Sequence, residues 1–145
     1  MSSETRHSSQ TVLVVDGDVI TRTVIADYLR HCGYRVIEAN SGEEAVAALG
    51  HEGFTVDVVL SDVSLPGRMS GFVLSQWVRQ NKPGVEVVLS SVVERAAEAA
   101  GDLCEDGPAL AKPYDPKTVV DHIKRLKGGG LATWNRKSSD SDLIR

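Results

Sequence analysis

The stretch Val12-Leu13-Val14-Val15-Asp16-Gly17-Asp18 decides the fold, because an apolar, β-branched run ends here in acidic residues. The run over 12–15 predicts a β-strand. From Val19 to His31, apolar residues recur every three or four positions, which indicates an amphipathic helix directly after the strand. Gly33 follows, at a position where helices commonly end. A strand joined to a helix in this way is the unit from which parallel α/β sheets are built.

The same alternation of short apolar runs and longer segments of helical period continues along the chain. Further strands are predicted at 34–37, 56–60, 85–89 and 109–111. Further helices are predicted within 41–50, 72–80, 93–100 and 119–126. Ser41 is expected to cap the first of these helices, with Glu44 three residues later completing a capping box. Five strand–helix units therefore predict an α/β domain with a parallel sheet covered by helices.

The length of 145 residues fits one domain with short extensions. Residues 1–10 are polar and serine-rich, and the segment 128–145 begins with three glycines and continues with several serines. Both segments are predicted to be tails. The folded domain is expected to span 11–127, and the 18 residues from Gly128 on are too few for a DNA-binding or catalytic output domain.

The composition excludes several classes of function. Acidic residues number 20 and basic residues 16, a formal net charge of −4, and no run of Lys or Arg is present. Direct binding to nucleic acid is therefore not expected. No apolar stretch approaches the about 18 residues that a membrane span needs. Cys32 and Cys104 lie far apart in sequence and are expected to form no disulfide, which favours a reducing, cytoplasmic location.

Polar residues stand at the carboxyl ends of the predicted strands, where parallel α/β sheets bind their ligands. They are Asp16, Asp18, Asp62, Ser90 and Lys112. Carboxylates about 5 Å apart repel one another by about 3 kcal/mol at an effective dielectric constant of 20, so they require a cation, and oxygen ligands favour Mg²⁺. A carboxylate beside such a cation and an ammonium can attack a phosphoryl group. The pattern predicts a site that forms an aspartyl phosphate.

Each of these residues also has a structural interpretation. An Asp after a strand is often only a helix cap, and Asp18 lies directly before the helix that begins at Val19. A lysine before a proline, such as Lys112, is by itself an ordinary loop residue. Asp62 is different, because a loop containing Pro66 and Gly67 follows it and no helix begins directly after it. A functional role is therefore best supported for Asp62.

Four segments together resemble the receiver domain of two-component response regulators. They are 12–18 with Arg22, Val59 to Gly67, Val87 to Ser91, and Ala111 to Tyr114. The resemblance covers about Thr11 to Lys127. It implies a doubly wound, flavodoxin-like sheet of five parallel strands in the order 2-1-3-4-5. Because the 18 residues from Gly128 on leave no room for an output domain, we expect a stand-alone receiver that signals through protein contacts or phosphoryl relay, with no separate enzymatic activity.

The resemblance also implies a role for each site residue. Asp62 would accept the phosphoryl group from a phosphohistidine on a histidine kinase or a histidine phosphotransfer protein. Asp16, Asp62 and the backbone carbonyl of Ser64 would hold Mg²⁺. Ser90 would be the switch hydroxyl and Lys112 would contact the phosphoryl oxygens, with a cis peptide bond before Pro113.

The sequence departs from the family pattern at two positions. Gly17 stands where the family has a second acid that binds the metal, so weak Mg²⁺ binding is expected unless Asp18 substitutes for it. Ala109 stands where the family has an aromatic switch residue, three positions before Lys112. A small conformational response is therefore expected at the fifth strand. The loop 66–71 is also one residue longer than the common form.

Two other functions fit parts of the sequence. Asp16 and Asp18 match the first motif of haloacid-dehalogenase-type phosphatases, with Asp16 as nucleophile and Asp18 as acid/base. That interpretation leaves Asp62 unexplained, and no acidic pair follows Lys112. The second alternative is a receiver-like interaction module that is never phosphorylated, as the substitutions at Gly17 and Ala109 would allow.

Overall fold

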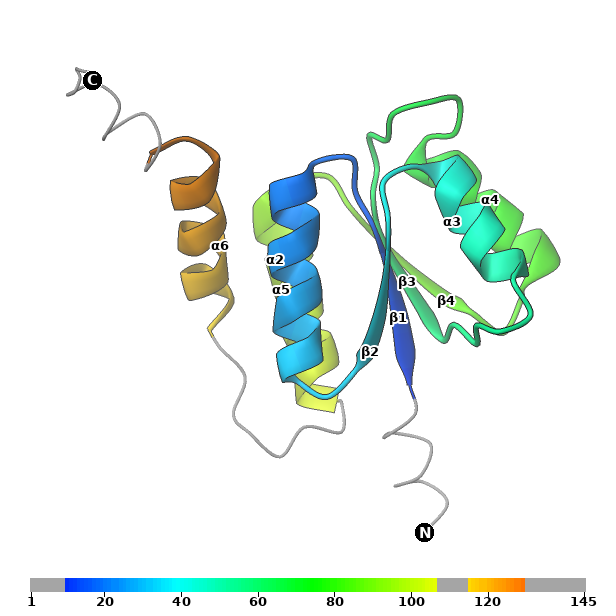
Figure 1. The fold of residues 1–145 in the computed structure, drawn as a ribbon, viewed down its shortest axis with the longest axis horizontal. Helices are drawn as coiled ribbons and strands as arrows, with labels where there is room; N and C mark the ends of the chain where they lie inside the picture. The colour runs from blue at the N-terminus through cyan, green and yellow to red at the C-terminus, as the bar shows by residue number, and fades with distance from the viewer. Residues whose placement is uncertain (1–9, 107–114, 130–145) are drawn as a thin grey trace, which may run out of the picture.

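A computed structural model of the chain describes residues 10–106 and 115–129 (Figure 1). The strands are β1 (Thr11–Val15), β2 (Arg35–Ala39), β3 (Val58–Asp62) and β4 (Glu86–Ser90). The helices are α2 (Val19–His31), α3 (Gly42–Gly50), α4 (Gly71–Asn81), α5 (Val93–Asp106) and α6 (Pro116–Lys124), which continues as a π-helical turn, Arg125–Gly129. The predicted helix from Val19 to His31 is confirmed at both ends.

The sheet is parallel and has the order β2-β1-β3-β4. Every residue of β1 is buried, because this strand lies inside the sheet and helices cover both faces. The register pairs Val15 with Ala39 on one side and with Ser61 on the other, so the carboxyl ends of three strands coincide. The predicted strand order is therefore confirmed for its first four strands.

Local sequence explains how the helices begin. Asp18 caps α2 by accepting a hydrogen bond from the backbone N–H of Ile20, at 3.3 Å. Ser41 caps α3 as predicted, accepting a hydrogen bond from the Glu44 N–H at 3.1 Å. Both caps satisfy backbone donors that the first turn of a helix leaves without partners.

The two faces of the sheet have separate cores. Leu13, Val15 and Val59 pack against α3 and α4 on one face. Val12, Val14 and Leu60 pack on the other face against α2, α5 and α6. Figure 1 shows these two layers on either side of the strands.

The position of α5 differs from the position that a right-handed five-stranded order implies. A right-handed connection from β4 to a strand on its outer side would place α5 with α3 and α4. Instead α5 packs beside α2, and α6 runs back along α5 in the opposite direction (Figure 1). The described residues form four strands, and the predicted strand 109–111 and Pro113 lie outside them.

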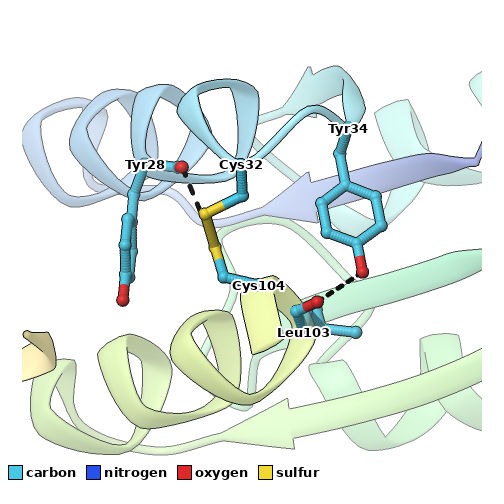
Figure 2. The surroundings of a disulfide bond; sticks show 5 residues. All are labelled: Tyr28, Cys32, Tyr34, Leu103 and Cys104. Atoms are coloured by element: carbon cyan, nitrogen blue, oxygen red, sulfur yellow. Dashed lines mark hydrogen bonds between the residues drawn. A yellow bond between two sulfur atoms is a disulfide. The ribbon is translucent and has the colours of Figure 1, made fainter. Parts of the chain in front are cut away.

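A disulfide joins Cys32, just after α2, to Cys104 in α5, so the expectation that these cysteines are unpaired is wrong (Figure 2). Their Cα atoms lie 5.3 Å apart although 72 positions separate them in sequence. The packing of α5 beside α2 brings them together, which separation along the chain cannot reveal. The Tyr34 hydroxyl joins the same two regions by donating a hydrogen bond to the Leu103 carbonyl.

We expect the Cys32–Cys104 bond to contribute strongly to stability. A cross-link over 72 positions removes enough chain entropy from the unfolded state to stabilise the protein by about 4 kcal/mol at 25 °C. Denaturant titration should show a loss of this order in the Cys32→Ala/Cys104→Ala variant. Reductant should destabilise the wild type and leave the variant unchanged. Two thiols reacting in denatured, unreduced wild type would contradict the bond.

Candidate functional site

Three carboxylates meet at the carboxyl edge of the sheet. Asp16 directly follows β1, Asp62 ends β3, and Asp18 caps α2. They line one pocket of about 170 Å³. The other lining residues are Thr21, Ser90, Ser91, Val92, Val93, Ala96 and Lys127. The predicted gathering of Asp16, Asp62 and Ser90 at the strand ends is thus found in the structure.

Asp16 is the carboxylate most affected by its surroundings. Its pKa is raised to about 6, chiefly by burial and to a smaller extent by the nearby charges of Asp62 and Asp18. One hydrogen bond opposes this shift, because the Asp18 N–H donates to Asp16 Oδ1 at 2.9 Å. The Arg22 guanidinium holds the backbone instead, donating to the Asp16 carbonyl at 2.9 Å. A cation would therefore relieve unfavourable charge at Asp16.

Asp62 lies between the backbone of the loop that follows it and Ser90 of the neighbouring strand. Burial raises the pKa of its carboxyl, while hydrogen bonds from the backbone N–H groups of Ser64 and Val63 lower it. Asp62 pairs with Ser90 in the register of β3 and β4, and the Ser90 residue is buried. The Val63 N–H also donates to the Ser90 carbonyl at 2.9 Å. A carboxylate, a hydroxyl and backbone donors thus meet at the end of one buried strand.

Gly71 fixes the loop that follows Asp62. A Cβ atom at this position would lie 2.3 Å from the Asp62 carbonyl oxygen, so only glycine allows α4 to begin here. The Gly71 N–H donates to the Val63 carbonyl at 2.8 Å. The start of α4 is therefore packed directly against the backbone of Asp62.

Asp18 has a different environment from the other two carboxylates. Burial alone would raise its pKa, but hydrogen bonds with Lys127 and Thr21 outweigh burial and hold it below its ordinary value. The Thr21 hydroxyl donates to Asp18 Oδ2 at 2.7 Å, and Lys127 Nζ forms an ion pair with the same oxygen. The structural role of Asp18 as a helix cap is thus confirmed.

Lys127 is a pocket residue that the sequence interpretation missed. It reaches the site because α6 runs toward the carboxyl edge of the sheet, and no local pattern predicts that direction. Thr21 was also missed, although its position three residues after a capping Asp was a usable signal. Lys112 and Ala109, which were predicted to matter, lie outside the described residues.

The donor set fits a hard cation of the Mg²⁺ type, which takes one or two carboxylates and keeps several waters. Asp16 and Asp62 offer carboxylate oxygens whose pKa values burial raises. Within residues 10–106 and 115–129, no group of three or more His, Cys, Asp or Glu side chains could hold a metal alone. The contact shown for Ser64 is from its N–H to Asp62, so its predicted carbonyl ligation stays a prediction.

Comparison with known proteins identifies relatives of this chain. Residues 12–124 match the family described as "Response regulator receiver domain". The chain is 31% identical over 118 residues to the transcriptional regulatory protein AruR of Pseudomonas aeruginosa, covering 79% of this chain. It spans 48% of the length of AruR, so the similarity covers about half of that protein.

Two solved structures are also similar. The chemotaxis response regulator CheY4 of Vibrio cholerae is 27% identical, with a TM-score of 0.53 over 81% of this chain and 98% of that chain. A chain in the complex of histidine kinase ThkA with response regulator protein TrrA is 26% identical, with a TM-score of 0.50 over 60% of this chain and 79% of that chain. Both likenesses agree with the parallel α/β core.

The ionisation of Asp16 should oppose folding. Its raised pKa favours the folded state when the carboxyl is protonated, and this contribution is lost as pH rises from about 4 through about 6. Asp16→Asn should therefore be more stable than wild type at pH 8, by about 1 kcal/mol after allowance for solvent screening. Thermal unfolding should show this gap closing as pH falls to 4. A gap independent of pH would contradict the shifted pKa.

Gly17→Asp alone should not restore the missing ligand. A Cβ atom at Gly17 would lie 2.7 Å from Cδ of Pro66, so the added side chain displaces the loop. We expect Gly17→Asp to lower stability and Gly17→Asp/Pro66→Ala to recover it, with tighter Mg²⁺ binding by calorimetry than in Pro66→Ala. Equal Mg²⁺ affinity in the last two variants would show that a carboxylate at 17 does not reach the cation.

Proposed function

The chain belongs to the response regulator receiver domain family, and from this membership we propose that Asp62 accepts a phosphoryl group in a two-component phosphorelay. One observation supports Asp62 above the others: it ends the buried strand β3 opposite Ser90, in the pocket that also contains Asp16. This arrangement combines a nucleophile, a hydroxyl donor and a second carboxylate for a cation.

The proposed step is a transfer between two side chains. An Asp62 oxygen attacks phosphorus, the new O–P bond forms, and the N–P bond of the donor phosphohistidine breaks, so the neutral imidazole leaves once it is protonated. The Ser90 hydroxyl and the backbone N–H of Ser64 donate hydrogen bonds to phosphoryl oxygens. Bound Mg²⁺ would neutralise charge on those oxygens. Lys112 is proposed to contact them as well.

The edge of the pocket suits a protein partner. Val92, which lines the pocket, is exposed, and so are three apolar residues that neighbour pocket or loop residues in sequence: Val19 after Asp18, Phe72 after Gly71, and Leu126 before Lys127. Apolar groups gathered at the rim of a polar site favour docking by another protein. We propose a histidine kinase or histidine phosphotransfer protein as the partner, in line with the ThkA–TrrA complex. Nucleic acid and membrane are not proposed as direct partners.

The chain is proposed to act in the cytoplasm. The described part of the chain contains no helix that is both long and apolar enough to cross a membrane. The Cys32–Cys104 disulfide removes the argument for a reducing compartment that the cysteine pattern gave. A cytoplasmic receiver is proposed from family membership alone.

The phosphatase alternative is disfavoured by the state of Asp18. An acid/base carboxyl must hold a proton near neutral pH, and the pKa of Asp18 is lowered by its ion pair with Lys127 and its bond from Thr21. Residues 12–124 match the receiver family instead. We therefore propose no separate enzymatic activity for this domain.

Phosphorylation of Asp62 can be tested by intact mass after treatment with acetyl phosphate and Mg²⁺. Wild type should gain one phosphoryl group, and Asp62→Asn should gain none, because the amide is not a nucleophile. Asp121→Asn, at an exposed position of α6, is the matched control and should label like wild type. Equal labelling of Asp62→Asn would refute the assignment. No labelling of wild type would favour the module that is never phosphorylated.

A further inference from the structure

The C-terminal end of α6 reaches the acidic pocket. Lys127, in the turn Arg125–Gly129, forms an ion pair with Asp18 and lines the pocket together with Asp16 and Asp62. Among the described lining residues it is the one cationic side chain. The pKa values of Asp16 and Asp62 are raised overall by burial, but the positive charge of Lys127 lowers them in part, as it lowers the pKa of Asp18. Lys127 therefore acts on all three carboxylates.

The rest of α6 is held independently of the pocket. Val119, Val120 and Ile123 are buried in the core that α6 shares with α2 and α5. Lys124 Nζ also pairs with Glu94 Oε2 at 2.7 Å, at the start of α5. Loss of the Lys127 contact therefore affects the turn and leaves the helix anchored.

The ion pair between Lys127 and Asp18 lies where another cation can replace Lys127. The Lys127 side chain is 48% exposed and that of Asp18 is 32% exposed, so solvent screens the pair and its net strength is small. A divalent cation beside Asp16 and Asp62 would repel the ammonium across a pocket of about 170 Å³. The two positive groups compete for the same negative charge.

We propose that Lys127 and a divalent cation are alternative counter-ions of the acidic pocket, so that cation binding releases the turn Arg125–Gly129 from Asp18. The inference rests on the proposed function for the cation and goes beyond it by linking the pocket to the end of α6. Occupation of the pocket is then transmitted to the end of α6.

The test compares Lys127→Met with Lys124→Met, which removes an equal charge from the same helix outside the pocket. Calorimetric titration with Mg²⁺ should show affinity about two- to fivefold higher in Lys127→Met than in Lys124→Met, the range for breaking one partly exposed ion pair. In ¹⁵N NMR spectra, Mg²⁺ should shift the amides of 125–129 in wild type and in Lys124→Met. Sodium chloride at matched ionic strength should not reproduce these shifts.

A third variant tests the partner of Lys127. Asp18→Asn removes the ion pair, so its turn amides should already lie near the Mg²⁺-bound positions before Mg²⁺ is added. Equal Mg²⁺ affinities in the two lysine variants, or turn amides that do not respond in wild type, would overturn the proposal. Failure of Asp62 to label with acetyl phosphate would count against the proposed function alone, because the competition requires only the carboxylates, Lys127 and the cation.

Discussion

Burial of the central strands on both faces is the constraint on which the rest of the structure depends. β1 has no exposed residue, and in β3 only Asp62, at the carboxyl end, escapes full burial. An ionised group inside either strand would lose its hydration without a partner, at a cost of several kcal/mol. In β1 and β3, charged side chains are therefore confined to the strand ends, and the parallel register brings those ends to one edge. The acidic pocket follows from the packing of the core.

The second feature that shapes the molecule is the position of α5. Because it packs with α2 and not with α3 and α4, Cys104 meets Cys32 and α6 returns as an antiparallel neighbour of α5. That return carries Lys127 to the carboxyl edge of the sheet. Lys127, the cationic side chain among the described residues of the pocket, thus comes from the end of α6, while the role predicted for Lys112 stays a prediction.

Local patterns were sufficient for the described helices and strands, since each depends on neighbours in sequence. The strand at 12–15, the helix from Val19 to His31 and the cap at Ser41 were all predictable in this way. The gathering of Asp16, Asp62 and Ser90 followed instead from the rule that parallel strands share one carboxyl edge. Contacts between distant segments could not be predicted from local patterns. The Cys32–Cys104 bond depends on which face α5 covers, and the approach of Pro66 to Gly17 depends on the path of a loop. From the sequence, Gly17 was interpreted only as the loss of a metal ligand. The structure shows that the absence of a side chain at Gly17 also leaves room for the ring of Pro66.

The disulfide also sets the covalent topology of the chain. It closes a loop from Cys32 to Cys104 that contains β2, β3 and β4, and therefore both Asp62 and Ser90. Asp16, Asp18 and Lys127 belong to the two arms outside this loop. A single peptide-bond cleavage inside the loop, for example between Asp62 and Gly71, leaves one connected molecule, whereas cleavage in either arm separates a fragment. The proposed acceptor thus lies in the part of the chain that tolerates one break without dissociating.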